Sequence, residues 1–287
     1  MAGKAQKELT LANRPHLLLV NPWISDFAAY DLWAKPLGLL LLASLLEEGG
    51  CEVSFIDCLD RHDPVTRGKK DLLQATHKHF HTGKYFKTPI PTPDPISDIP
   101  RRYYRYGIHP ASLESRLEDI RPPDLILLTC IMTYWYPGAF DTIVSLRRAF
   151  PGVPIWLGGI YARLCADHAR KHSGADEIFD QAEHLLPARL GQALGVGLSN
   201  PEAWSPSAPL PPPALELVEH CEYAPLLSSL GCPFNCPYCA SSILQPVNRQ
   251  RDPEALYSDI ERWHTDLGVE DFAFYDDALV IDTERCL

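Results

Sequence analysis

Three cysteines, Cys232, Cys236 and Cys239, stand close together in the segment GCPFNCPYC (231–239). Successive side chains of a strand point to opposite faces, so cysteines at this spacing cannot all share one strand face. A tight loop can instead turn the three thiols toward one small object. Because thiolates are ligands for zinc, copper(I) and iron–sulfur clusters, the segment predicts a metal site.

Three kinds of site compete for this spacing. A structural zinc ion takes four ligands, usually as two pairs from separate segments, and no second C-x-x-C or H-x3-H follows the trio. An iron–sulfur cubane is normally held by four thiolates, so three would leave one iron open to a non-protein ligand. Unrelated thiols are the third interpretation, although three of the nine cysteines cluster here.

The segment matches the C-x3-C-x2-C signature and resembles the radical S-adenosylmethionine (SAM) superfamily, with the usual aromatic residue, Tyr238, before the last cysteine. FAFYDDALV (272–280) is similar to the second barrel strand of these enzymes. KPLGLLLLASLLEEGGCEVSFIDC (35–58) and VPIWLGGIYA (153–162) are similar to the cobalamin-binding domain that precedes the radical core in one subgroup.

The resemblance implies a set of cofactors and a reaction. Cys232, Cys236 and Cys239 would each bind one iron of a [4Fe-4S] cluster, and SAM would chelate the fourth iron. One electron, from a donor such as flavodoxin or ferredoxin, would cleave SAM to methionine and a 5′-deoxyadenosyl radical. In cobalamin-dependent members, the corrinoid can instead relay a methyl group to a small-molecule substrate. Tyr238 would lie near the adenine, or would pack as an ordinary aromatic beside the loop.

The elements that must position this loop begin with an α/β domain over 14–198. Short apolar runs predict buried strands, and the segments between them predict helices. The expected strands are 16–21, 51–58, 123–130, 153–159 and 176–180, and the expected helices are 36–48, 137–149, 166–175 and 185–195. This alternation predicts a doubly wound parallel sheet of the flavodoxin or Rossmann type. Residues 60–110 are proline-rich and predict an insertion, largely loop.

Cobalamin contacts are expected at the carboxyl ends of the strands, where a doubly wound sheet binds ligands. The candidate residues are Asn21, Thr129, Thr133, Gly158, Gly159 and Tyr161. The domain lacks the D-x-H-x-x-G motif whose histidine coordinates cobalt in many corrinoid proteins. The glycine pair can also be a plain tight turn.

A linker and a second unit follow the first domain. Residues 199–213 are rich in proline and predict an extended, semi-rigid linker. The second unit, 214–287, is expected to begin a partial (β/α) barrel, with strands at 223–231 and 271–277 and a helix opened by Asp252. Asp276 and Asp277 end the second strand and would contact substrate, act as an acid–base pair, or simply cap the strand.

The barrel of the family needs more chain than follows Cys239, since six strands take roughly 30 residues each. The sequence is therefore interpreted as a C-terminally incomplete radical SAM protein, a fragment or one half of a split system that a separate chain completes. Two other functions stay open. One is a corrinoid-binding or regulatory module with a vestigial cluster segment, and the other is a zinc-stabilised α/β domain without catalysis.

Composition narrows the possible partners. The chain of 287 residues has a net charge of −11, so we expect no nucleic-acid binding. No apolar run reaches the roughly 20 residues of a membrane span. Nine cysteines without a secretory signal predict reduced thiols in the cytoplasm. The histidines of HKHFH (77–81) offer metal ligands, but no carboxylate or cysteine lies near them in the sequence, and a solvated segment is the favoured interpretation.

Overall fold

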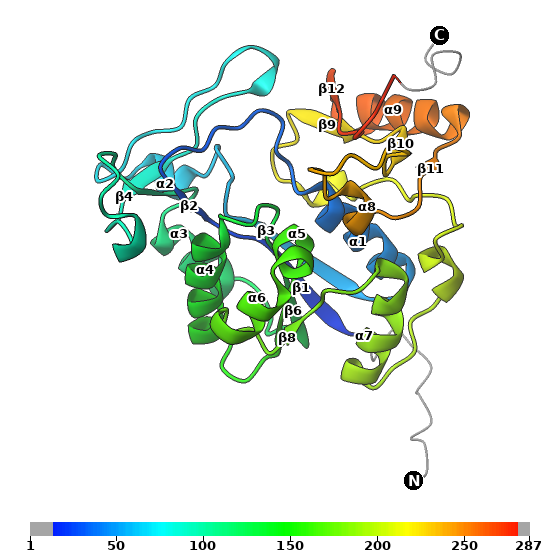
Figure 1. Ribbon diagram of the computed structural model, residues 1–287, viewed down its shortest axis with the longest axis horizontal. Helices are drawn as coiled ribbons and strands as arrows, with labels where there is room; N and C mark the ends of the chain where they lie inside the picture. The colour runs from blue at the N-terminus through cyan, green and yellow to red at the C-terminus, as the bar shows by residue number, and fades with distance from the viewer. Residues whose placement is uncertain (1–13, 281–287) are drawn as a thin grey trace.

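The computed structural model describes residues 14–280 and is built around a five-stranded parallel sheet (Figure 1). Its strands lie in the order β3-β1-β6-β7-β8. Their bounds are β1 His16–Asn21, β3 Glu52–Asp57, β6 Leu125–Thr129, β7 Ile155–Gly158 and β8 Glu177–Ile178. The second strand in chain order lies outside the first, and the others follow on its far side, which is the flavodoxin-like order. The predicted doubly wound sheet is confirmed.

Helices cover both faces of the sheet because alternate strand residues face opposite sides. Leu18 and Val20 of β1 face one core, which α3 (Pro110–Glu118), α4 (Tyr136–Ala149), α5 (Gly159–Leu164) and α6 (Ala166–His172) cover. Leu17 and Leu19 face the other core, which α1 (Leu37–Glu48) and α7 (Leu186–Leu194) cover. Strands buried on both faces explain the continuous apolar runs of the sequence.

The insertion contains more regular structure than the expected loop. β5 (Tyr104–Tyr106) pairs antiparallel with β2 (Ile24–Asp26) on one side and with β4 (Lys87–Pro89) on the other. Proline is compatible with β4 because this strand lies at a sheet edge. The short helices α2 (Pro64–Arg67), η2 (His79–His81) and η3 (Asp94–Ile96) complete the segment.

The second unit begins a parallel sheet, in which β9 (Tyr223–Leu226) pairs with β12 (Asp271–Phe274). Between them lie β10 (Ser229–Leu230), α8 (Ser241–Leu244), β11 (Arg249–Gln250) and α9 (Pro253–Leu267). The predicted strand 223–231 is thus divided into β9 and β10. Asp252 caps α9 and accepts a hydrogen bond from the Glu254 amide, as its sequence position predicts.

Helix α1 joins the two units, since it also packs against the second one, drawn yellow to red in Figure 1. Leu40 is buried in a cluster with Leu226 of β9 and Trp263 of α9. A helix covered on two sides is apolar nearly all round, which accounts for the run LGLLLLASLL.

The proline-rich segment 199–213 runs along α1 rather than standing free in solvent. Trp204, in the short helix η5 (Pro201–Trp204), is buried against the sheet core. The Ser44 hydroxyl donates to the Pro212 carbonyl at 2.6 Å, and the Ala214 amide donates to the Leu40 carbonyl at 3.1 Å. Two further turns, η4 (Glu183–Leu185) and η6 (Leu215–Leu217), flank this region. Within the described residues, no helix combines the length and apolar character needed to cross a bilayer.

Candidate functional site

The cysteine loop leaves and re-enters the fold through a short two-stranded base. β10 pairs antiparallel with β11, and the chain between them carries the three cysteines. Gly231 opens the loop at φ +82°, where a Cβ would lie 2.9 Å from the carbonyl oxygen of Val247. The Asn248 side chain donates to the Gly231 carbonyl at 3.1 Å. Glycine is therefore required at Gly231 for both the turn and the close approach.

The thiols of this loop differ in environment from cysteines of the core. Cys232 and Cys236 are half-buried and Cys239 is exposed. By contrast, burial raises the pKa of Cys51 to about 11 and that of Cys130 to about 12. The Ser241 hydroxyl and amide hydrogen-bond to Cys239 and lower the pKa of its thiol. An accessible thiol with a lowered pKa is suited to binding metal as the thiolate.

Arg163 fixes the loop to the carboxyl edge of the five-stranded sheet. It lies on α5, directly after β7, and donates to the carbonyl oxygens of Ile243 at 2.9 Å and of Leu244. Its side chain also pairs with Glu183 at 3.4 Å, and Gln245 donates to the same carboxylate. Arg163 was not predicted from the sequence, although its position after the glycine pair at a strand end was a usable signal.

A cavity of about 490 Å³ lies between the sheet edge and the cysteine loop. This volume is within the range of roughly 300–1,000 Å³ that small-molecule sites occupy. Its walls are mostly apolar side chains of α1, β6 and β7, together with the proline-rich segment. Gly231 and Ser241 of the cysteine loop, and Tyr275 and Asp277 after β12, close the other side. The cavity thus adjoins both the sheet and the loop.

The structure brings only part of the predicted cobalamin set to this cavity. Thr129, Gly158 and Gly159 line it. Asn21, Thr133 and Tyr161 are not among its lining residues. The side-chain amide of Asn21 instead donates a hydrogen bond to the Asp57 carboxylate at 2.8 Å, and the Tyr161 hydroxyl lies 2.6 Å from Nδ1 of His168.

The remaining predicted residues occupy distinct places around the loop. The Asp276 carboxylate accepts hydrogen bonds from the amides and hydroxyls of Ser228 and Ser229, at 2.6–3.0 Å. These hydrogen bonds tie the segment after β12 to the turn between β9 and β10. Asp277 lines the cavity, and the side chain of Tyr238 is 89% exposed. Tyr275, which was not predicted from the sequence, also lines the cavity, and its hydroxyl accepts a hydrogen bond from the Lys35 backbone amide at 2.9 Å.

Comparisons with known proteins give structural neighbours. No family model matches the sequence. No curated protein matches it either. The fold is similar to solved structures of the radical S-adenosylmethionine methyltransferase TsrM from Kitasatospora setae. One, with tryptophan substrate and a SAM analogue bound, has a TM-score of 0.59 at 16% identity. Another, with cobalamin and a [4Fe-4S] cluster bound, has a TM-score of 0.57 at 14% identity.

Each comparison covers 94% of this chain but 49% of the TsrM chain, so this sequence spans about half the length of its structural neighbours. At this identity the similarity shows the fold alone. The fold is the doubly wound sheet together with the start of the second unit, in an arrangement that a radical SAM and cobalamin protein also has.

Proposed function

We propose that the chain is a radical SAM protein that holds a [4Fe-4S] cluster on Cys232, Cys236 and Cys239 and binds cobalamin beside it. The observation that carries the proposal is the cavity that adjoins both the sheet edge and the cysteine loop. The similarity in fold to a methyltransferase that binds both cofactors supports it. When bound, these groups would supply one-electron cleavage of SAM and transfer of a methyl group.

The residues present fit these groups. The cysteine loop offers three accessible thiols. Gly231 and Ser241 of this loop line the cavity, although the three cysteines do not, and the apolar walls suit a large, flat macrocycle. Three thiolates are one fewer than a cubane has irons, which leaves the coordination position that SAM needs. Tyr238 is proposed to contact SAM, and Asp277 is the acidic side chain that would face a substrate.

Residues of this chain would position the cysteine loop and keep water out of the cavity. Gly231 and the β10–β11 base set the entry of the loop, Arg163 ties its far end to the sheet, and Asp276 fixes the turn before it. Thr129 and the Gly158–Gly159 pair line the cavity at the carboxyl ends of β6 and β7. A flavodoxin or ferredoxin is proposed as the electron donor, and a small molecule is proposed as the substrate.

Anaerobic reconstitution with iron and sulfide tests the cluster. We expect about four irons per chain, and we expect Cys236→Ala to lose them. Cys165→Ala is the matched control, because Cys165, between α5 and α6, packs against the core of the sheet and is not one of the three loop thiols, so it should leave the iron content unchanged. Bound zinc without iron would instead favour the zinc-stabilised domain.

A cavity-filling variant tests the corrinoid. A Cβ at Gly158 meets no atom within 4 Å, and its backbone is extended, so Gly158→Phe would place a ring in the cavity without backbone strain. We expect wild type to retain added hydroxocobalamin through gel filtration and Gly158→Phe to lose it while unfolding at the same urea concentration. Retention by wild type without any cluster would favour the regulatory corrinoid-binding module, and equal retention by the variant would rule out this cavity as the site.

A further inference from the structure

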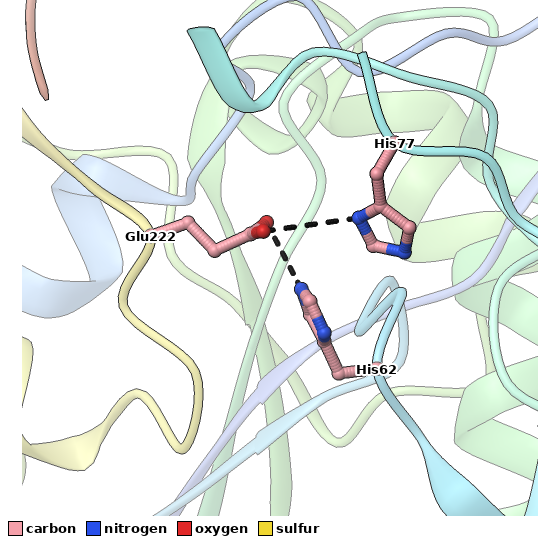
Figure 2. Close-up of side chains that lie close together, drawn as sticks. All are labelled: His62, His77 and Glu222. Carbon is pink, nitrogen blue, oxygen red and sulfur yellow. Dashed lines mark ion pairs between the residues drawn. The ribbon is translucent and has the colours of Figure 1, made fainter. Parts of the chain in front are cut away.

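The histidines of the HKHFH segment have a carboxylate neighbour that the sequence did not reveal. Glu222, directly before β9, lies against His77 and also against His62, which follows β3 (Figure 2). The three residues come from the insertion and from the start of the second unit. They lie outside the cavity of the cysteine loop, which does not include them among its walls.

The three side chains present ligand atoms toward one another. Nε2 of His62 lies 2.9 Å from Oε2 of Glu222, and Nδ1 of His77 lies 3.8 Å from Oε1 (Figure 2). The imidazole rings of His62 and His77 have centroids 4.6 Å apart. One ligand atom from each residue lies within 4.8 Å of the other two. Small side-chain movements would bring the three atoms to the roughly 2.0–2.2 Å at which zinc binds nitrogen and oxygen ligands.

Arg61 holds the segment that carries His77. Its side chain is 4% exposed and donates to the carbonyl oxygens of Thr76 at 3.0 Å, of Thr82 at 3.4 Å and of His81. Gly83 closes this turn, where a Cβ would lie only 1.8 Å from the Thr76 carbonyl oxygen. The histidine is therefore presented by a turn that the fold holds in place.

We propose that His62, His77 and Glu222 form a zinc site that links the insertion to the second unit. Two imidazoles and a carboxylate are a ligand set that zinc accepts in tetrahedral geometry. The fourth position is open to water or to His81, whose Nδ1 lies 3.4 Å from Oε1 of Glu222. The other ring nitrogen of His81 lies 3.0 Å from Asp271 at the start of β12, which is the kind of carboxylate partner that orients a metal-binding histidine.

The charges around the site allow a divalent cation. The Arg61 guanidinium lies 3.2 Å from Glu222 and 3.4 Å from Nδ1 of His77, and it also pairs with Asp31 at 2.9 Å. Zinc binding would therefore displace the Arg61 contacts with Glu222 and His77 and leave its ion pair with Asp31. A cavity of about 90 Å³ adjoins the group and is lined by His62, Glu222 and Arg61, while His77 is not among its lining residues. The neighbouring group of Asp60, Glu219 and His220 is a weaker candidate, since Arg116 already lies 2.7 Å from Asp60 and 3.5 Å from Glu219.

Zinc binding is tested in a chain whose loop thiols have been removed. The variant carrying Cys232→Ala, Cys236→Ala and Cys239→Ala is stripped with chelator, dialysed against buffered ZnCl₂ and analysed for bound metal. We expect one zinc per chain. Adding His62→Ala or Glu222→Gln should weaken binding at least about tenfold, the scale seen when the surroundings of a metal site are altered. His79→Ala is the matched control, because His79 is exposed in the same segment and should leave binding unchanged.

Cobalt(II) in place of zinc gives an independent measurement on the wild-type chain, after its exposed thiols have been alkylated. Ligand-field absorption without thiolate-to-cobalt charge transfer is expected, and it should disappear in His62→Ala. The proposal would be overturned if the loop variant bound no zinc and the alkylated wild type showed no cobalt ligand-field absorption. Equal zinc binding by the His62→Ala and His79→Ala variants would also overturn it. Neither measurement depends on the cluster or on cobalamin, so the zinc site and the proposed function can fail separately.

Discussion

Gly159, which lines the large cavity, and Gly152, in the turn before β7, form a matched pair for substitution. Their φ angles are +86° and +85°, so an alanine at either position adopts a backbone conformation that L-residues disfavour. Their surroundings differ. A Cβ at Gly152 meets nothing within 4 Å, whereas a Cβ at Gly159 would lie 2.6 Å from Oγ1 of Thr129 and 2.9 Å from backbone atoms of Cys130.

The difference in free energy of unfolding between the two alanine variants isolates the cost of that close approach. Left-handed backbone costs an alanine about 1–2 kcal/mol, and the smaller entropy of the unfolded chain returns about 0.4–1 kcal/mol. Gly152→Ala should therefore lose about 1 kcal/mol. Gly159→Ala carries the same backbone cost plus overpacking of about 1–3 kcal/mol. We expect a difference of about 1–3 kcal/mol between the variants.

Urea unfolding followed by tryptophan fluorescence measures this difference, and Trp156 lies in β7 close to the substituted position. Combining Gly159→Ala with Thr129→Ala should recover only part of the loss, because the contacts with the Cys130 backbone remain. Equal losses for Gly152→Ala and Gly159→Ala would refute the packing argument. Complete recovery in the double variant would show that the backbone contacts carry no cost.

Three further predictions concern stability. Burial lowers the pKa of His16, so below neutral pH the folded state binds fewer protons at this residue than the unfolded state does. The contribution of neutral His16 to the free energy of unfolding is therefore complete above the ordinary histidine pKa of about 6.5. This contribution is lost as pH falls below that value, at no more than about 1.4 kcal/mol per pH unit. His16→Gln should flatten that part of the pH profile of unfolding, and an unchanged slope would contradict the assignment. Trp263 is only 2% exposed in the core shared with α1. Trp263→Ala should therefore lower the free energy of unfolding, measured by urea titration, by about 3–5 kcal/mol. A loss under about 1 kcal/mol would contradict this packing role. Asp276→Ala removes the acceptor of two serine amides and should lower the free energy of unfolding by about 1–3 kcal/mol. It should also make the cysteine loop more sensitive to protease. Asp277→Ala, at the neighbouring position, is the control and should change the free energy of unfolding by no more than about 0.5 kcal/mol.

The sheet was predictable because its signals are local. Strands β1 and β6 are largely continuous apolar runs, because a strand that is buried on both faces needs apolar side chains at consecutive positions. The cap of α9 was equally readable, since Asp252 and Pro253 stand next to each other at its start. The cysteine spacing, likewise local, placed the loop after a strand and before a helix, although the strand proved to be two.

Other features depend on contacts between distant segments. The insertion forms a small sheet because β5 pairs with β2, which precedes it by about eighty residues, and the prolines between gave no sign of this pairing. Glu222 meets His62 across an even longer separation. The proline-rich segment has the composition of a linker, yet Trp204 packs into the core and its neighbours line the cavity. Amino-acid composition indicates the conformation of an isolated segment, but it does not show which other parts of the chain the segment packs against.

The position of α1 makes the two units one cooperative system. Its Leu39, Ala43 and Leu46 belong to the core of the sheet, while its Leu40 belongs to the core of β9 and α9. Cutting the chain at the proline-rich segment would therefore expose an apolar face on each product, and neither is expected to fold as well alone. Because α1 also lines the large cavity, a substitution in this helix changes a cavity wall and the packing of both units together.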